Sequence, residues 1–115
     1  MYQILNFLTM SYRFMRVIVF FDLPTTTEND RKNYRKFRNF LVKYGFMMIQ
    51  ESVYAKLALN STQVVQITND VKKEVSERGL VQILSVTEKQ FVKMELISGK
   101  CNSTVVDSDE RLLIL

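Results

Sequence analysis

The most apolar run in the chain is Val17 to Phe21, and the segment Asp22-Leu23-Pro24 follows it directly. A strand this apolar is typical of one that is buried on both faces of a sheet. Pro24 cannot donate a hydrogen bond to a sheet ladder and therefore ends the strand sharply. We predict a strand over residues 12–21, with the carboxylate of Asp22 at its tip and at the rim of the fold.

A basic amphipathic stretch comes next and predicts a helix over residues 28–44. Thr25 and Glu28 have the spacing of a capping box, which predicts the start of the helix. Gly45 is well placed to end it in the left-handed conformation. One face carries the apolar residues at the 3.6-residue period, namely Tyr34, Phe37, Phe40, Leu41 and Tyr44.

The rest of the chain alternates between short apolar runs and one further amphipathic stretch. Strands are expected at 46–49 and 53–59 as a hairpin, and again at 81–86 and 91–97. Between these pairs, Asn60 is expected to cap a second helix that Gly79 ends. Its buried side would consist of Val64, Ile67, Val71 and Val75.

The order β-α-β-β-α-β, with an additional C-terminal strand, predicts an α+β fold of the ferredoxin-like type. Both helices would lie on one face of an antiparallel sheet, and a second copy is the economical cover for the other face. We expect an N-terminal extension at 1–9, the ferredoxin-like domain at 10–98 and a tail at 99–115. Met10 is an alternative to Met1 as the first residue of the natural protein. Residues 111–115 would form a strand that pairs with a sheet edge, either its own or the partner's.

Composition excludes several kinds of chemistry. The 115 residues include no histidine, so a Ser-His-Asp or Cys-His nucleophile system cannot be built from this chain alone. A single cysteine excludes an internal disulfide and fits a reducing cytoplasm. Any metal would have to be held by oxygen atoms, which favours Mg²⁺ or Mn²⁺. No apolar run reaches the roughly 20 residues that a membrane helix needs.

Positive charge is concentrated at one end of the chain. The net charge is +4, and residues 1–45 hold eight Lys and Arg against three Asp and Glu. A solvated helix face is the ordinary explanation of a charge run, but such a face usually mixes both signs. The first helix instead carries acids only near its start, where the helix dipole favours them. We predict that it grips nucleic-acid phosphates through Arg31, Lys32, Arg35, Lys36 and Arg38.

Asp22 is the candidate metal ligand and catalytic residue. It could instead cap the turn before the first helix. One carboxylate binds magnesium weakly, so a metal site needs a second acid, and Glu28 and Asp30 are the candidates within the chain. A dimer could supply a second Asp22. Two carboxylates about 4 Å apart repel by roughly 1 to 4 kcal/mol, which a metal or a shared proton would relieve.

Four segments together resemble one family, the small CRISPR-associated protein Cas2. They are Val17-Ile18-Val19-Phe20-Phe21-Asp22-Leu23-Pro24, Tyr34-Arg35-Lys36-Phe37-Arg38, Gln50-Glu51-Ser52-Val53-Tyr54 and Thr87-Glu88-Lys89-Gln90-Phe91. The tail with Ser108-Asp109-Glu110-Arg111 resembles the type II-A branch.

The resemblance implies a ferredoxin-like homodimer that bridges the Cas1 integrase and holds double-stranded prespacer DNA during spacer acquisition. It also implies a magnesium-dependent endonuclease acting on RNA or DNA, with Asp22 of each protomer at the dimer interface. Many members carry tyrosine before that aspartate, where this chain has Phe21. The alternatives are a nuclease that acts independently of the integrase, and a ferredoxin-like regulatory module or toxin-like RNase.

Overall fold

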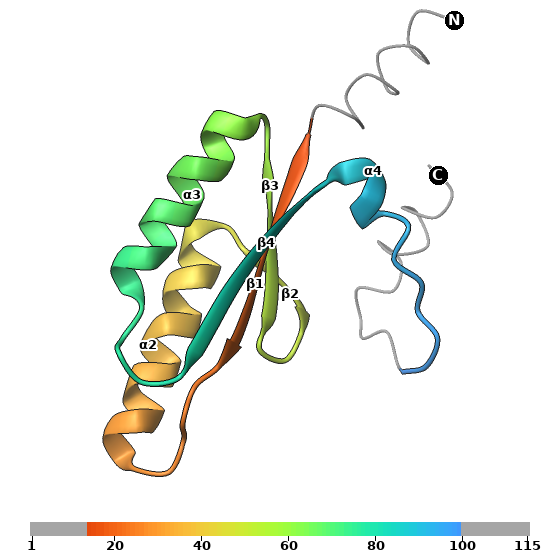
Figure 1. The fold of residues 1–115 in the computed structure, drawn as a ribbon. Coiled ribbons are helices and arrows are strands. Elements are labelled where there is room, and N and C mark those ends of the chain that lie inside the picture. The colour runs from red at the N-terminus through yellow and green to blue at the C-terminus, as the bar shows by residue number, and fades with distance from the viewer. Residues whose placement is uncertain (1–13, 100–115) are drawn as a thin grey trace, which may run out of the picture.

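The computed structural model describes residues 14–99, which form one antiparallel sheet with two long helices on one of its faces (Figure 1). The elements are β1 (Met15–Asp22), α2 (Glu28–Tyr44), β2 (Met47–Gln50), β3 (Val53–Ala58), α3 (Ser61–Glu74), β4 (Leu80–Thr87) and α4 (Glu88–Phe91). The strand order is β2-β3-β1-β4, with every neighbouring pair antiparallel. This arrangement confirms the predicted ferredoxin-like fold.

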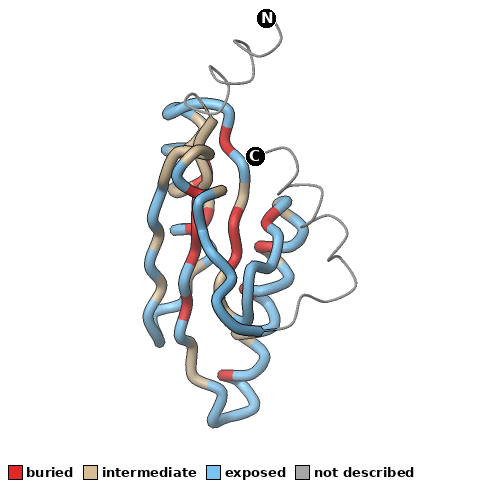
Figure 2. Tube along the Cα trace, turned by 90° about the vertical axis from the view of Figure 1, so that its right-hand side faces the viewer, coloured by how far each residue is buried: buried red, intermediate tan, exposed pale blue. Residues whose placement is uncertain are grey.

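The core lies between the sheet and the two helices. Alternation along β1 points Val17, Val19 and Phe21 at the helices, and all three are buried. On the opposite face Ile18 is buried but Phe20 is 36% exposed, so the predicted burial of this strand on both faces is confirmed only near Ile18. Buried residues accordingly follow the inner strands and the inner sides of the helices (Figure 2). The predicted apolar faces of both helices are confirmed.

Helix α2 begins at Glu28 as predicted, but a different pair of residues caps it. The capping box is formed by Thr27 and Asp30, not by Thr25 and Glu28. The Asp30 amide donates to Thr27 Oγ1 at 3.0 Å, and the Thr27 amide donates to Asp30 Oδ2 at 3.2 Å. A capping box joins the residue before the helix to the third helical residue, so a helix beginning at Glu28 selects this pair. The other end is as predicted, with Gly45 left-handed at φ 105°.

The end of α3 also differs. Asn60 caps its start as expected, because its side chain accepts a hydrogen bond from the Gln63 amide. The helix ends at Glu74, however, and Val75 is already extended. Gly79 therefore does not terminate the helix. It lies in the loop that leads into β4, where it packs against the end of β1.

The strand expected at 91–97 is wrong. Thr87 and Gln90 form a capping box that starts the short helix α4, and Phe91 is buried against Ile18 and Ala55. Arg16 fixes this helix, since its guanidinium makes two 2.7 Å hydrogen bonds to Glu88 and lies over the Phe91 ring. The capping-box spacing of Thr87 and Gln90 is the feature of the sequence that indicates this helix. The strand expected at 111–115 lies outside the described residues.

The sheet face away from α2 and α3 remains largely apolar and uncovered. Helix α4 covers one end of it, as Figure 1 shows. Side chains that remain at least one third exposed on the rest of this face are Phe20, Met47, Leu57, Leu80 and Leu84. No helix of residues 14–99 is long and apolar enough to cross a membrane.

Candidate functional site

Asp22 ends β1 with an exposed side chain, as the sequence predicts. Its register partner is Leu80, the first residue of β4. Alternation puts its carboxylate on the same sheet face as Ile18 and Phe20, which is the face without the long helices. The acid is therefore held at the rim of the open apolar face.

The loop before β4 packs tightly against the backbone that carries this acid. A Cβ added to Gly79 would lie 2.9 Å from the Asp22 carbonyl oxygen and 2.7 Å from a Leu23 methyl group. Gly79 also has φ 97°, a conformation that other residues adopt only with strain. Close approach and backbone conformation both require glycine here, so Gly79 helps to fix the position of Asp22.

We expect Gly79→Ala to lower the free energy of unfolding by about 2 kcal/mol or more, because strain and a backbone clash add. Urea denaturation measures the effect. Gly45→Ala is the matched control, since its φ is 105° but its added Cβ would meet only the flexible Lys56 side chain. Equal losses in the two variants would show that the packing against Asp22 contributes nothing.

The turn between β2 and β3 holds the other side of the β1 terminus. The Phe21 amide donates to the Ser52 carbonyl oxygen at 3.0 Å, and the Ser52 and Tyr34 hydroxyls lie 3.2 Å apart. Ser52 has φ 66°, so this contact holds a residue in a sparsely populated conformation. The Phe21 ring packs on Tyr34, Phe37 and Tyr54 in the helix-facing core. A side chain at position 21 thus points away from the Asp22 carboxylate.

Neither of the other two candidate acids joins Asp22. Asp30 is only 2% exposed, and Arg78 Nη1 donates to its Oδ1 at 2.8 Å while the Thr27 amide occupies Oδ2. Glu28 is an exposed residue of the first helical turn. Within residues 14–99 no group of three or more His, Cys, Asp or Glu side chains could hold a metal ion. Of the three acids considered from the sequence, only Asp22 lies on this rim with an exposed carboxylate that no other contact engages.

The predicted basic residues of α2 are exposed but do not form one uniform stripe. Arg31 turns back and donates to the carbonyl oxygens of Thr25 and Thr26 at 3.2 and 3.1 Å. Arg38 lies on the side of Tyr54, where its charge counteracts the rise that burial causes in the Tyr54 pKa. The other three line an open hollow of about 720 Å³, together with Asn39, Phe40, Lys43, Tyr44 and Glu74.

Aromatic residues of this hollow were not predicted to have a functional position. Phe40 and Tyr44 pack edge to face with centroids 5.4 Å apart. The Tyr44 hydroxyl donates to the Asp70 carboxylate of α3, and this hydrogen bond raises the pKa of Tyr44 to about 12. Sequence periodicity predicts that both rings lie on the core face. Only the packing of α2 beside α3 shows that both residues also line the hollow.

The Tyr44 hydrogen bond predicts a pH dependence of stability. The folded pKa of about 12 exceeds the ordinary value of 10, so the contribution is complete below pH 10 and is lost between about pH 10 and 12. Tyr44→Phe should therefore show a shallower loss of stability over that interval. Thermal denaturation at several pH values measures it, and parallel curves for both proteins would contradict this assignment.

The family model for CRISPR associated protein Cas2 matches residues 15–94. The chain belongs to the CRISPR-associated Cas2 family. The matched segment extends from the first residue of β1 past α4, so the exposed aspartate at the end of β1 and the whole of the basic helix fall inside the Cas2 match.

Curated relatives agree over nearly the full length. A CRISPR-associated endoribonuclease Cas2 of Treponema denticola is 50% identical over 101 residues, covering 88% of this chain and all of that protein. One from Streptococcus mutans is 44% identical, covering 88% of this chain and 93% of that protein. A crystal structure of Streptococcus pyogenes Cas2 at pH 6.5 matches the fold with a TM-score of 0.56 and 21% identity, covering 72% of this chain and 99% of that one.

Proposed function

We propose that this Cas2 protein is a homodimeric scaffold of spacer acquisition, which bridges the Cas1 integrase and binds double-stranded prespacer DNA. The observation that carries the proposal is the exposed surface of α2. After Asp30 this helix has six Lys and Arg residues and no acid. A surface helix that served solubility alone would gain from paired charges of both signs.

The length of α2 suits contact with a nucleic-acid backbone. Its 17 residues span about 25 Å, and the basic side chains are distributed along most of that distance. Lys32, Arg35 and Lys36 are the exposed cations best placed for phosphates, with Arg38 on one flank. Arg31 already donates to two carbonyl oxygens, so we assign it a smaller contribution. Such contacts bind any sequence and weaken with salt.

The open sheet face supports the dimer. Phe20, Leu57 and Leu84 are between about one third and one half exposed there, and a second copy would remove them from water. The same packing would bring two Asp22 residues to one interface, because Asp22 points toward that face. Analytical ultracentrifugation tests this assembly. Leu84→Lys should shift the protein toward monomer, and an unchanged dimer would place the interface elsewhere.

A metal-dependent nuclease is the second candidate, and the exposed Asp22 favours it. Paired Asp22 carboxylates offer the oxygen ligands that Mg²⁺ or Mn²⁺ takes, and magnesium commonly binds through one or two carboxylates plus substrate phosphates. When bound, the ion would supply a Lewis acid for phosphodiester hydrolysis. Asp22 would hold it, and the loop containing Gly79 would fix the backbone that carries this carboxylate. The substrate could be RNA, as the names of the relatives suggest, or DNA.

Two experiments separate these roles. Co-purification with the Cas1 integrase, followed by a gel shift with a blunt DNA duplex, tests the bridge. Failure to bind the duplex would contradict the scaffold proposal. Spacer acquisition in cells expressing Asp22→Ala tests whether the carboxylate matters there. We place the protein in the cytoplasm, where its DNA substrate and integrase partner would be found.

A further inference from the structure

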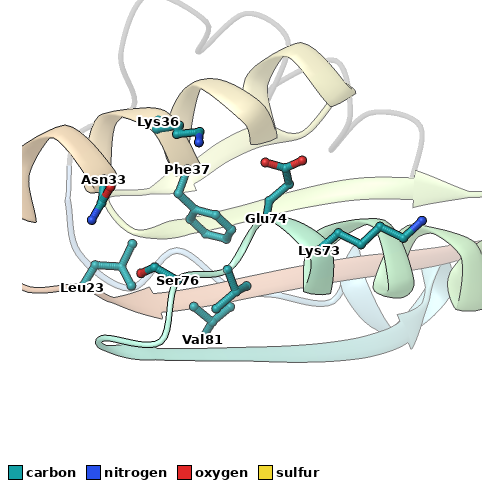
Figure 3. A pocket seen from close by; sticks show the side chains of 9 residues that line it. Leu23, Asn33, Lys36, Phe37, Lys73, Glu74, Ser76 and Val81 are labelled. Carbon is teal, nitrogen blue, oxygen red and sulfur yellow. The ribbon is translucent and has the colours of Figure 1, made fainter.

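A small cavity opens between the start of β4, the end of α3 and the inner side of α2 (Figure 3). Its volume is about 230 Å³. Apolar side chains form much of its wall, namely Leu23, Phe37, Val75 and Val81. The volume lies below the roughly 300 Å³ at which pockets for drug-sized ligands begin, so a single planar ring is the appropriate size of occupant.

Hydrogen-bonding groups enter this cavity from two sides. The Asn33 side chain comes from α2 and the Ser76 hydroxyl from the loop after α3, and both lie near Leu23 in Figure 3. Among the described residues, no hydrogen bond engages the Asn33 amide group. The Ser76 hydroxyl makes one long contact, 3.3 Å to the Arg78 carbonyl oxygen. An amide and a hydroxyl can both donate and accept, which suits the edge of a nucleobase.

The cavity adjoins the basic hollow on α2. Lys36 and Glu74 line both spaces, so the two meet at this pair. The hollow adds Lys32, Arg35 and Lys43, and the charge balance of these lining residues is strongly positive. Phosphates placed in the hollow would therefore lie beside an apolar cavity with a polar rim. This combination of a basic groove and a site for a flat ring is typical of single-stranded nucleic-acid binding.

We propose that this cavity binds one unpaired nucleobase of a nucleic acid whose phosphates lie along α2. The base would pack against Leu23 and Val81, and its edge would meet Asn33 and Ser76. The neighbouring phosphates would meet Lys36 and Arg35. The inference rests on the proposed phosphate-binding role of α2 and adds to it a preference for strands that carry an unpaired base.

Fluorescence anisotropy with two single strands of six nucleotides tests the site. One is ordinary DNA, and the other is the same strand without its bases, so that phosphate charge is identical. The wild-type protein should prefer the strand with bases by about 10-fold, because the cavity removes one apolar ring face from water. Asn33→Ala should reduce that preference to about 2-fold and leave affinity for the base-free strand unchanged. Asn39→Ala, on the same helix but outside the cavity, should keep the full preference.

A second variant tests the cavity independently of any change that Asn33→Ala causes in the local structure. Ser76→Phe would fill the cavity from an exposed loop position, and it should abolish the preference without lowering thermal stability. Equal affinity of the wild type for both strands, or equal effects of Asn33→Ala and Asn39→Ala, would overturn the inference. Failure to bind any strand or duplex would instead contradict the proposed function. The same measurement with a matching pair of RNA strands shows whether the site prefers RNA or DNA.

Discussion

Reversing two charges on α2, with Lys32→Glu and Arg35→Glu together, is expected to weaken binding of a blunt DNA duplex by about 100-fold at 0.1 M salt. Both residues line the basic hollow and are exposed, so the fold should be retained. A phosphate whose contact is lost also keeps its bound counterions when the protein binds, so fewer counterions are released. The slope of log K against log salt should therefore become shallower by about 2. A gel-shift titration at several salt concentrations measures both quantities.

The matched control is Lys72→Glu with Lys93→Glu. It changes the net charge by the same amount, at exposed positions that lie outside α2, outside the cavity and outside the basic hollow. A general loss of positive charge would weaken binding equally in the two variants. Binding that stays within 3-fold of wild type in the α2 variant would contradict the scaffold proposal, because α2 is the described helix whose exposed surface carries only basic charges beyond its first turn.

Asp22→Asn is expected to reduce magnesium-dependent cleavage of RNA or DNA by at least about 100-fold, if the nuclease candidate is correct. The amide keeps the shape of the side chain at the exposed end of β1 but removes its charge, and Mg²⁺ is held in proteins through one or two carboxylates, which a neutral amide oxygen replaces poorly. Cleavage of a labelled single strand, with magnesium or with a chelator, measures the effect. The same variant should bind duplex DNA as well as the wild type does.

Glu77→Gln is the control for this variant, since it removes one exposed acid from the loop near the same end of the sheet. It should leave cleavage unchanged. Equal cleavage by wild type and Asp22→Asn would assign the activity to a contaminating nuclease. Loss of spacer acquisition in cells, with duplex binding intact, would argue that Asp22 has more than a structural part in acquisition.

Local signals account for most of the elements. The apolar run of β1, the period of α2 and α3, and the caps at Asn60 and Gly45 all specify structure within one turn or strand, and each is confirmed. The wrong predictions are also local. Residues 91–97 have the composition of a strand, but the capping box of Thr87 and Gln90 starts a helix before them. The buried contact of Phe91 with Ile18 then stabilises that helix.

The environment of the candidate site could not be obtained in the same way. The sequence allows Asp30 as a second acid, but its capping box and its ion pair with Arg78, which is 48 residues away, engage both carboxylate oxygens. The sequence predicts Gly79 as a helix terminator, but glycine is required there because the loop passes close to the Asp22 carbonyl oxygen. Both contacts join segments distant in the chain, and no periodicity encodes them.

The sequence by itself determined the order of elements, the position of Asp22 at a strand end and the basic character of α2, because these depend on neighbouring residues. Only the tertiary structure decided which groups share a surface. It placed the Asp22 carboxylate on the open apolar face and Phe21 on the other, and it set α2 beside α3 so that Asn33 and Lys36 line a cavity. Such surfaces arise from packing between elements, which side-chain patterns along one element do not specify.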